Sequence, residues 1–131
     1  MPPPGLRTLQ SLNGPVETLD RLVAAVSRHG MTVFARIDHG AAADKIGMEL
    51  RPTVLVLFGN PKAGTPTMQA RQTIGIDLPL KALIWQDEKG VTWLGYNEPA
   101  WIARRHGLAD DGTFEVMQDV LESVAGEATG R

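Results

Sequence analysis

One short segment constrains the fold of this chain more than any other. Residues 53–58 read TVLVLF, a nearly continuous apolar run rich in β-branched side chains. Such a run is typical of a strand in the middle of a sheet. The run stops at Gly59-Asn60-Pro61, because glycine and proline interrupt regular structure. The chain must therefore supply further strands that flank this one and helices that cover the sheet.

Four other segments carry strand patterns. Apolar and polar residues alternate from Met31 to Ile37, which predicts a half-buried strand with Phe34 and Arg36 on its outward side. Two later strands flank a loop at 87–90, and this spacing predicts a hairpin in which Gly90 adopts a positive φ. The predicted strands are residues 6–12, 31–37, 80–86 and 91–96.

Capping residues predict where helices begin and end. Pro15 suits a first helical position, and Gly30 suits the left-handed cap that ends the same helix. Thr65-Pro66 has the form of an N-cap followed by a first-turn proline. Asn97, and either Asp110 or Asp111, are the predicted caps of the last two helices. The predicted helices are residues 15–29, 41–46, 65–72 and 99–106 and a last helix after the aspartates, with an irregular link at 73–79.

Apolar spacing also predicts which side of the long helices is buried. Two sets of residues recur at intervals of three or four. In the first helix this set is Val16, Leu19, Val23 and Val26, and in the last helix it is Phe114, Met117, Leu121 and Val124.

The mixed order of strands and helices, with one clear hairpin, favours the α+β class. We expect a single domain over residues 1–131, with a flexible tail at 1–5 and a largely antiparallel sheet covered by helices on one face. The other face of the sheet must then meet solvent or a partner. Trp85 and Trp93 lie in the hairpin strands, so an aromatic open face is expected, and with it a homodimer.

Composition excludes several classes of function. Thirteen basic and fifteen acidic residues give a net charge of −2, which argues against nucleic acid as the partner. The chain of 131 residues has no cysteine, which excludes disulfides, thiol nucleophiles, cysteine zinc sites and iron–sulfur clusters. No apolar run approaches the ~20 residues of a membrane span, and no signal peptide is visible. A cytoplasmic location without membrane contact is the resulting expectation.

Four short segments stand out in order along the chain: 33–39 (VFARIDH), 58–61 (FGNP), 76–81 (IDLPLK) and 96–99 (YNEP). Together they resemble a known family, the domain of unknown function family 302. Lys45, Gly47 and Arg51-Pro52 are similar to that family, and the resemblance runs in order from about residue 14 to 125. It implies a fold like that of the TATA-box-binding protein and usually a dimer, and it implies no activity. Gly59 stands where many relatives have a cysteine, so a role that needs a thiol there does not carry over.

Two loop junctions carry candidate site residues, each with a structural alternative. Asp38 and His39 follow a strand; Asp38 either orients His39 as a general base or metal ligand, or caps the next helix. Asn60 follows the central strand, where it either contacts a ligand or simply forms a turn.

Three further residues are candidates for the site, and Asp77 and Tyr96 again have a structural alternative. Asp77 either fixes its own loop or supplies a carboxylate beside His39, and Lys81 pairs with it or contacts an anion. Tyr96 offers a hydroxyl for binding, or is a buried aromatic with its hydroxyl at the rim. His29 and His106 precede helix-ending glycines and are expected to be structural. The three histidines lack metal-ligand spacing, so neither a metal nor a cofactor is expected.

Three functions fit these observations. The first is a homodimeric binding module that takes a small polar or anionic ligand at the loop junctions. The second is an enzyme with His39 as general acid or base, assisted by Asp38 or Asp77; it requires His39 and Asp77 to meet in a pocket. The third is a protein-interaction or regulatory module that uses the open sheet face or the acidic last helix.

Overall fold

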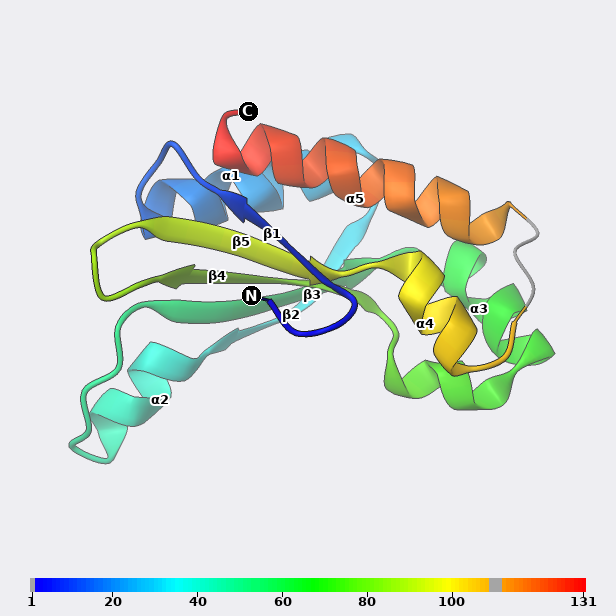
Figure 1. Ribbon diagram of the computed structural model, residues 1–131, viewed down its shortest axis with the longest axis horizontal. Helices are drawn as coiled ribbons and strands as arrows, with labels where there is room; N and C mark the ends of the chain where they lie inside the picture. The colour runs from blue at the N-terminus through cyan, green and yellow to red at the C-terminus, as the bar shows by residue number, and fades with distance from the viewer. Residues whose placement is uncertain (1, 109–111) are drawn as a thin grey trace.

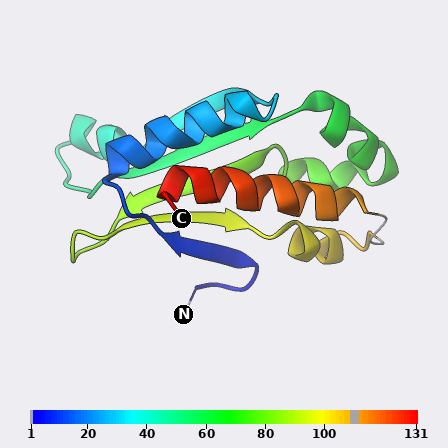
Figure 2. The same ribbon diagram turned by 90° about the horizontal axis from the view of Figure 1, so that it is seen from above.

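The computed structural model describes residues 2–108 and 112–131. Its elements are β1 (Leu6–Gln10), α1 (Pro15–Arg28), β2 (Thr32–Asp38), α2 (His39–Lys45), β3 (Thr53–Gly59), α3 (Pro61–Ala70), the 3₁₀ helix η1 (Gln72–Ile76), β4 (Leu80–Gln86), β5 (Thr92–Asn97), α4 (Pro99–Arg105) and α5 (Thr113–Thr129). The strands form one antiparallel sheet in the order β1-β5-β4-β3-β2. Both α1 and α5 lie across one face of it (Figures 1 and 2). The α+β class with helices on one face of the sheet is confirmed.

The alternation of side chains along each strand divides the sheet into two faces. Val56 and Phe58 of β3 point toward the helices and are fully buried. The intervening residues point to the opposite side, which we call the open face. On that side the rings of Trp85 and Trp93 stack with centroids 6.5 Å apart. The open face includes the partly buried residues Thr8, Leu55, Leu57, Leu83, Trp85 and Trp93.

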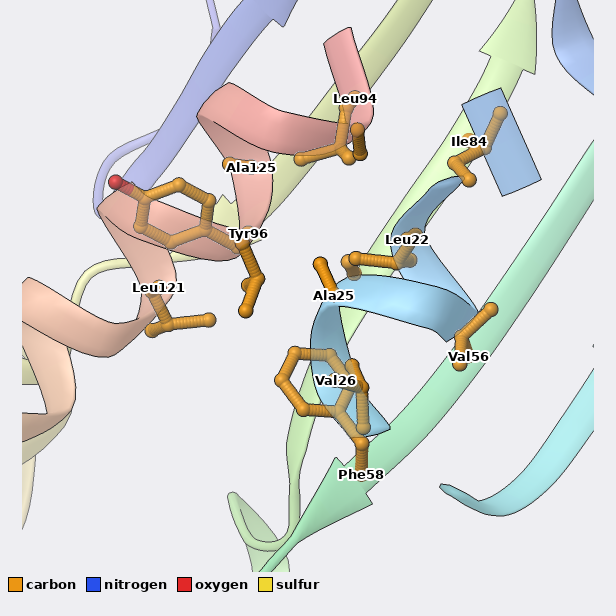
Figure 3. Packing of buried hydrophobic residues seen from close by; sticks show 13 residues of the cluster. Leu22, Ala25, Val26, Val56, Phe58, Ile84, Leu94, Tyr96, Leu121 and Ala125 are labelled. Carbon is orange, nitrogen blue, oxygen red and sulfur yellow. The ribbon is translucent and has the colours of Figure 1, made fainter. Parts of the chain in front are cut away.

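The main core lies between the sheet and the helix pair (Figure 3). This core includes Leu22 and Val26 of α1, Leu121 of α5 and Phe58 of β3, and each is at most 1% exposed. Burial of such large apolar side chains is the main favourable contribution to folding. The four apolar residues predicted on the last helix are all buried, as expected.

A second, smaller core lies at one end of the sheet. It joins η1, α4 and the first turns of α5, so these elements form one block beside the main core. Its buried members are Ile74, Ile102, Ala103, Phe114 and Met117.

The predicted face of α1 is confirmed at Val26 and wrong at Val16, while Leu19 is partly buried against the core. Val16 is 73% exposed, and the buried stripe runs through Thr18, Leu22, Ala25 and Val26. Hydrophobicity alone overlooks this stripe, because two of its members are small or polar. The small Ala25 lets α1 approach α5 closely. The Thr18 hydroxyl is satisfied by Ser11 Oγ at 2.6 Å, so its burial leaves no unpaired polar group.

The start of α3 is also earlier than predicted. Asn60 is the N-cap, and its side-chain oxygen accepts a hydrogen bond from the Lys62 N–H at 2.9 Å. Pro61 takes the first helical position, which leaves Pro66 inside the helix. Asn60-Pro61 and Thr65-Pro66 both consist of a capping residue followed by a proline that suits the first helical position. The helix begins at the earlier of the two pairs.

A β-bulge in β2 overturns the predicted alternation there. The pairing shifts between Val33 and Ala35, so that Val33 faces Phe58 while Arg36 faces Val56. Arg36 therefore shares the helix-covered side with Val56 instead of pointing outward with Phe34. An extra residue in one strand reverses the side on which all later residues lie.

The caps predicted for the last two helices have different outcomes. The boundary residue of α4 is Glu98, with no side-chain cap bond, so the predicted capping role of Asn97 is wrong. Asp110 and Asp111 lie outside the described residues. Among the described helices, none combines the length and apolarity that crossing a bilayer requires.

Candidate functional site

A cavity of about 500 Å³ lies at the end of β3, on the side where α1 stops and α5 continues. Its walls come from the start of β2, from α3, from the first half of α5 and from the segment before β4 (Figure 2). Its lining residues include Met31, Phe34, Leu57, Gly59, Asn60, Ala63, Met68, Leu78, Leu80, Val116, Met117 and Val120.

The local sequence explains why a cavity forms at this point. The β3 strand ends at Gly59, and the cap at Asn60 turns the chain directly into α3. The first turns of α5 pack against α4 in the second core, and the cavity lies between the end of α1, α3 and the first half of α5. Asn60 was predicted either to contact a ligand or to form a turn; it turns the chain into α3 as the N-cap, and it also lines the cavity.

The lining is mainly apolar, with few polar side chains. Three of its residues are methionines, whose flexible thioether side chains adapt to irregular shapes. The polar side chains in the lining are His29, Asn60 and Thr65.

His29 is held in place by an acidic partner. Its Nε2 lies 3.1 Å from a carboxylate oxygen of Glu127, and Arg28 donates to the other oxygen at 3.1 Å. Burial raises the pKa of Glu127, but the hydrogen bonds from Arg28 and His29 outweigh it and leave the pKa below its ordinary value. Glu127 therefore fixes the end of α1 beside the cavity as a carboxylate.

Asp38 and His39 lie at the opposite end of the sheet. Asp38 pairs with Val54 at the start of β3, whereas Asn60 follows its end, which places the two loops ~20 Å apart. The Asp38 side chain accepts a hydrogen bond from Ala41 N–H at 2.9 Å. Of the two alternatives for Asp38, the structure therefore contains the helix cap.

Asp77 has partners that were not predicted. Arg105 Nη1 lies 2.9 Å from both carboxylate oxygens of Asp77, and His106 Nε2 lies 2.6 Å from one of them. Lys81 instead donates to the Asp77 backbone carbonyl at 3.2 Å. Burial lowers the pKa of Lys81, and the nearby Asp77 only partly opposes this effect.

Asp77 therefore does not meet His39. Asp77 belongs to the end of the sheet that holds α4, and His39 begins α2 at the other end (Figure 1). The geometry that the predicted His39–Asp77 enzyme requires is absent from the described residues. His39 also does not line the cavity.

Tyr96 is buried on the helix-covered side of the sheet, with 2% of its surface exposed (Figure 3). Its hydroxyl accepts a hydrogen bond from Gln118 Nε2 at 3.4 Å. Burial raises the pKa of Tyr96 above its ordinary value. Tyr96 is thus a core residue with its hydroxyl directed to α5, as in the structural alternative.

Comparison with known proteins places this fold in a family. Residues 7–124 match the family model of the domain of unknown function DUF302. The chain belongs to the DUF302 family. A crystal structure of an uncharacterized conserved DUF302 protein from Bacillus stearothermophilus superposes on this DUF302 domain with a TM-score of 0.79 at 20% sequence identity, covering 98% of each chain.

Closer sequence relatives of this DUF302 domain bear another name. Proteins named Fluoride-specific ion channel FluC 1 from Brucella suis biovar 1 (strain 1330) and Brucella abortus biovar 1 (strain 9-941) are each 45% identical to it over 128 residues. The match covers 96% of this chain but only 50% and 47% of those proteins. The chain thus spans about half the length of the curated relatives it matches.

Two features of the DUF302 domain were not predicted from the sequence. One is the cluster around Asp77, in which Thr73 Oγ1 also lies 3.1 Å from Nδ1 of His106. A histidine before a helix-ending glycine gave no sign of this long-range pairing. The other is the contribution of Met31, Met68 and Met117 to the cavity, because methionines on apolar faces are indistinguishable from core residues in a sequence.

Proposed function

We propose that this DUF302 domain is a small-molecule-binding module whose ligand occupies the cavity at the end of β3. The volume and apolar lining of that cavity carry the proposal. Sites for small molecules typically measure ~300–1,000 Å³ and combine mostly apolar walls with a few polar groups. A cavity of about 500 Å³ with methionines in its walls has these properties.

The lining also narrows the ligand class. The expectation of a polar or anionic ligand came from loop residues that lie at opposite ends of the sheet. Around the cavity, polar side chains are confined to His29, Asn60 and Thr65, whereas the rest of the lining is apolar. The ligand that fits best therefore has an apolar body and a single polar or anionic end, and decanoate and decanol are suitable probes.

Calorimetric titration of the chain with decanoate and with decanol tests this function. Ala63 lines the cavity, so the bulky indole of an Ala63→Trp variant should occupy it and weaken binding at least tenfold. Ala24 is exposed on α1 and does not line the cavity, so Ala24→Trp is the matched control with unchanged affinity. Absence of binding by both probes, or equal binding by the two variants, would overturn the proposal.

We further infer that the module acts as a homodimer. The open face carries no covering helix within the described residues, and it presents leucines and two stacked tryptophans. Apolar patches that contain tryptophan are typical of protein interfaces. Sedimentation equilibrium of the chain tests this part; a monomer at all concentrations contradicts it.

One observation favours a second candidate function, an interaction module. In the Brucella relatives named as fluoride-specific channels, the matched region is joined to a further stretch of about equal length. Under this candidate, the DUF302 domain binds the remainder of such a protein. Pull-down of the detergent-purified remainder of the Brucella suis protein by this chain is the expected result, and no retention would contradict it.

A further inference from the structure

An arm of apolar residues projects from the domain at the end of β2. We define the α2 arm as residues 39–50; it lies below the sheet, on the side away from α1 and α5 (Figure 1). Within five residues it exposes three large apolar side chains: Ile46 is 72% exposed, Met48 61% and Leu50 48%. Exposing a cluster of such side chains to water is energetically unfavourable. Another surface is therefore expected to cover these residues of the arm.

The open face next to the arm is hollowed. A groove of about 340 Å³ lies between the residues that follow α2 and the strand β4. Its floor is formed by open-face side chains, among them Leu83 and Trp85, and Leu50 contributes to one wall. Of the arm only Leu50 lines this groove, so Ile46 and Met48 do not occupy the groove of their own chain.

Charges at the groove and on the arm are complementary. Arg51 and Asp87 line the groove. Hydrogen bonds from the Trp93 indole and the Val91 amide lower the pKa of Asp87, so this carboxylate is charged at neutral pH. The arm carries Lys45 and Glu49 on either side of its apolar tip. A second arm seated in the groove can therefore bring a cation toward Asp87 and an anion toward Arg51.

The size of the open face supports the same arrangement. Five strands with ~4.8 Å spacing and ~6 residues of ~3.3 Å each give a flat area of about 480 Å². A standard interface buries about 800 Å² per partner. The arm borders the open face through Leu50, and its exposed apolar side chains would add to the area that two associated copies bury.

We propose that two copies of this chain exchange their α2 arms, so that Ile46 and Met48 of each copy pack into the groove beside Leu83 and Trp85 of the other. A two-fold axis makes the contact self-complementary, because each copy contributes both an arm and a groove. This inference rests on the homodimer of the proposed function and specifies how the two copies meet.

The first test compares the dimer dissociation constants of full-length variants by sedimentation equilibrium. The double variant Ile46→Asp/Met48→Asp should raise the constant at least tenfold, because charged side chains would enter an apolar groove. Val16 is 73% exposed on α1, which covers the other face of the sheet, so Val16→Asp is the matched control and should leave the constant unchanged. Circular dichroism verifies that each variant folds.

The outcomes distinguish failure of the homodimer from failure of the arm exchange. A monomeric wild-type chain would overturn both the homodimer and the arm exchange. A dimer that the arm variant leaves intact would overturn the arm exchange alone, because the copies would then associate through the sheet or another surface.

A second test uses the absence of native cysteine. Mixed Met48→Cys and Leu83→Cys chains should form a disulfide-linked pair of one copy of each under mild oxidation, identified by its intact mass. The mixture of Val16→Cys with Leu83→Cys is the control and should stay unlinked. Links only between two Met48→Cys chains would contradict the arrangement, since they place arm against arm.

Discussion

At the scale of single residues, the cluster around Asp77 holds two elements together. Asp77 follows η1, and its carboxylate is bound by Arg105 and His106 at the end of α4. The side chains of His106 and Asp77 are only 8% and 11% exposed. Hydrogen bonds to a charged group in such a poorly solvated place contribute more than those on the surface.

We predict that His106→Ala lowers the free energy of unfolding by about 2 kcal/mol, because it removes a charge-assisted hydrogen bond and leaves Thr73 without its partner. Urea unfolding measures the change. The neighbouring Arg104 is exposed, so Arg104→Ala should stay within about 0.5 kcal/mol of the wild type. Equal effects of the two variants would contradict a structural role for the cluster.

The hairpin loop supplies a pH-dependent prediction. The Asp87 pKa is lowered first by the hydrogen bond from the Trp93 indole at 2.9 Å and next by the Val91 amide. A carboxyl group with a lowered folded-state pKa stabilises the fold above its ordinary value of 3.8, and this contribution is lost as the pH falls through the folded-state pKa. The stabilising contribution of Asp87 to the hairpin should therefore be complete above pH 3.8 and decrease as the pH falls below that value.

Carbon-13 NMR titration of the Asp87 carboxyl group checks the cause. Trp93→Phe removes the indole donor and should move the pKa of Asp87 up toward 3.8. Trp85 stacks on Trp93 but does not bond Asp87, so Trp85→Phe is the control and should leave the lowered pKa in place. An unchanged pKa in the Trp93 variant would show that the indole is not the cause.

At the scale of elements, local signals predicted strands well and helix starts less well. The run at 53–58 became β3, and the hairpin with its loop became β4 and β5, because their patterns depend only on neighbouring residues. The bulge in β2 and the buried side of α1 depend on the partner strand and on α5. Those contacts come from distant parts of the chain, so a local pattern cannot encode them.

The cap of α3 gives the element-scale prediction. Asn60→Ala should lower the free energy of unfolding by about 1 kcal/mol, the usual cost of losing an N-cap hydrogen bond. Asn97 makes no cap bond to α4, so Asn97→Ala is the matched control and should cost less than about 0.5 kcal/mol. Thermal or urea unfolding that ranks the two variants in the reverse order would contradict the cap assignment.

At the scale of the whole molecule, strand order decides which candidate residues meet. Asp38 and Asn60 both follow strands, but β2 and β3 are antiparallel, which sends their loops to opposite ends of the sheet. The sequence therefore predicted Asn60 at a site and grouped it with residues that lie elsewhere. The cavity lies where the end of α1, α3 and the first half of α5 come together, and no single motif reveals that arrangement.

The central claim is that a small molecule with an apolar body and one polar or anionic end occupies this cavity, and methionine methyl NMR tests it most directly. The chain has five methionines; Met31, Met68 and Met117 line the cavity, whereas Met48 is on the α2 arm. On titration with decanoate, the carbon-13 methyl signals of those three should shift together to saturation while the Met48 signal stays fixed. Shifts confined to Met48, or no saturable shift of the three cavity methyl groups, would contradict the claim.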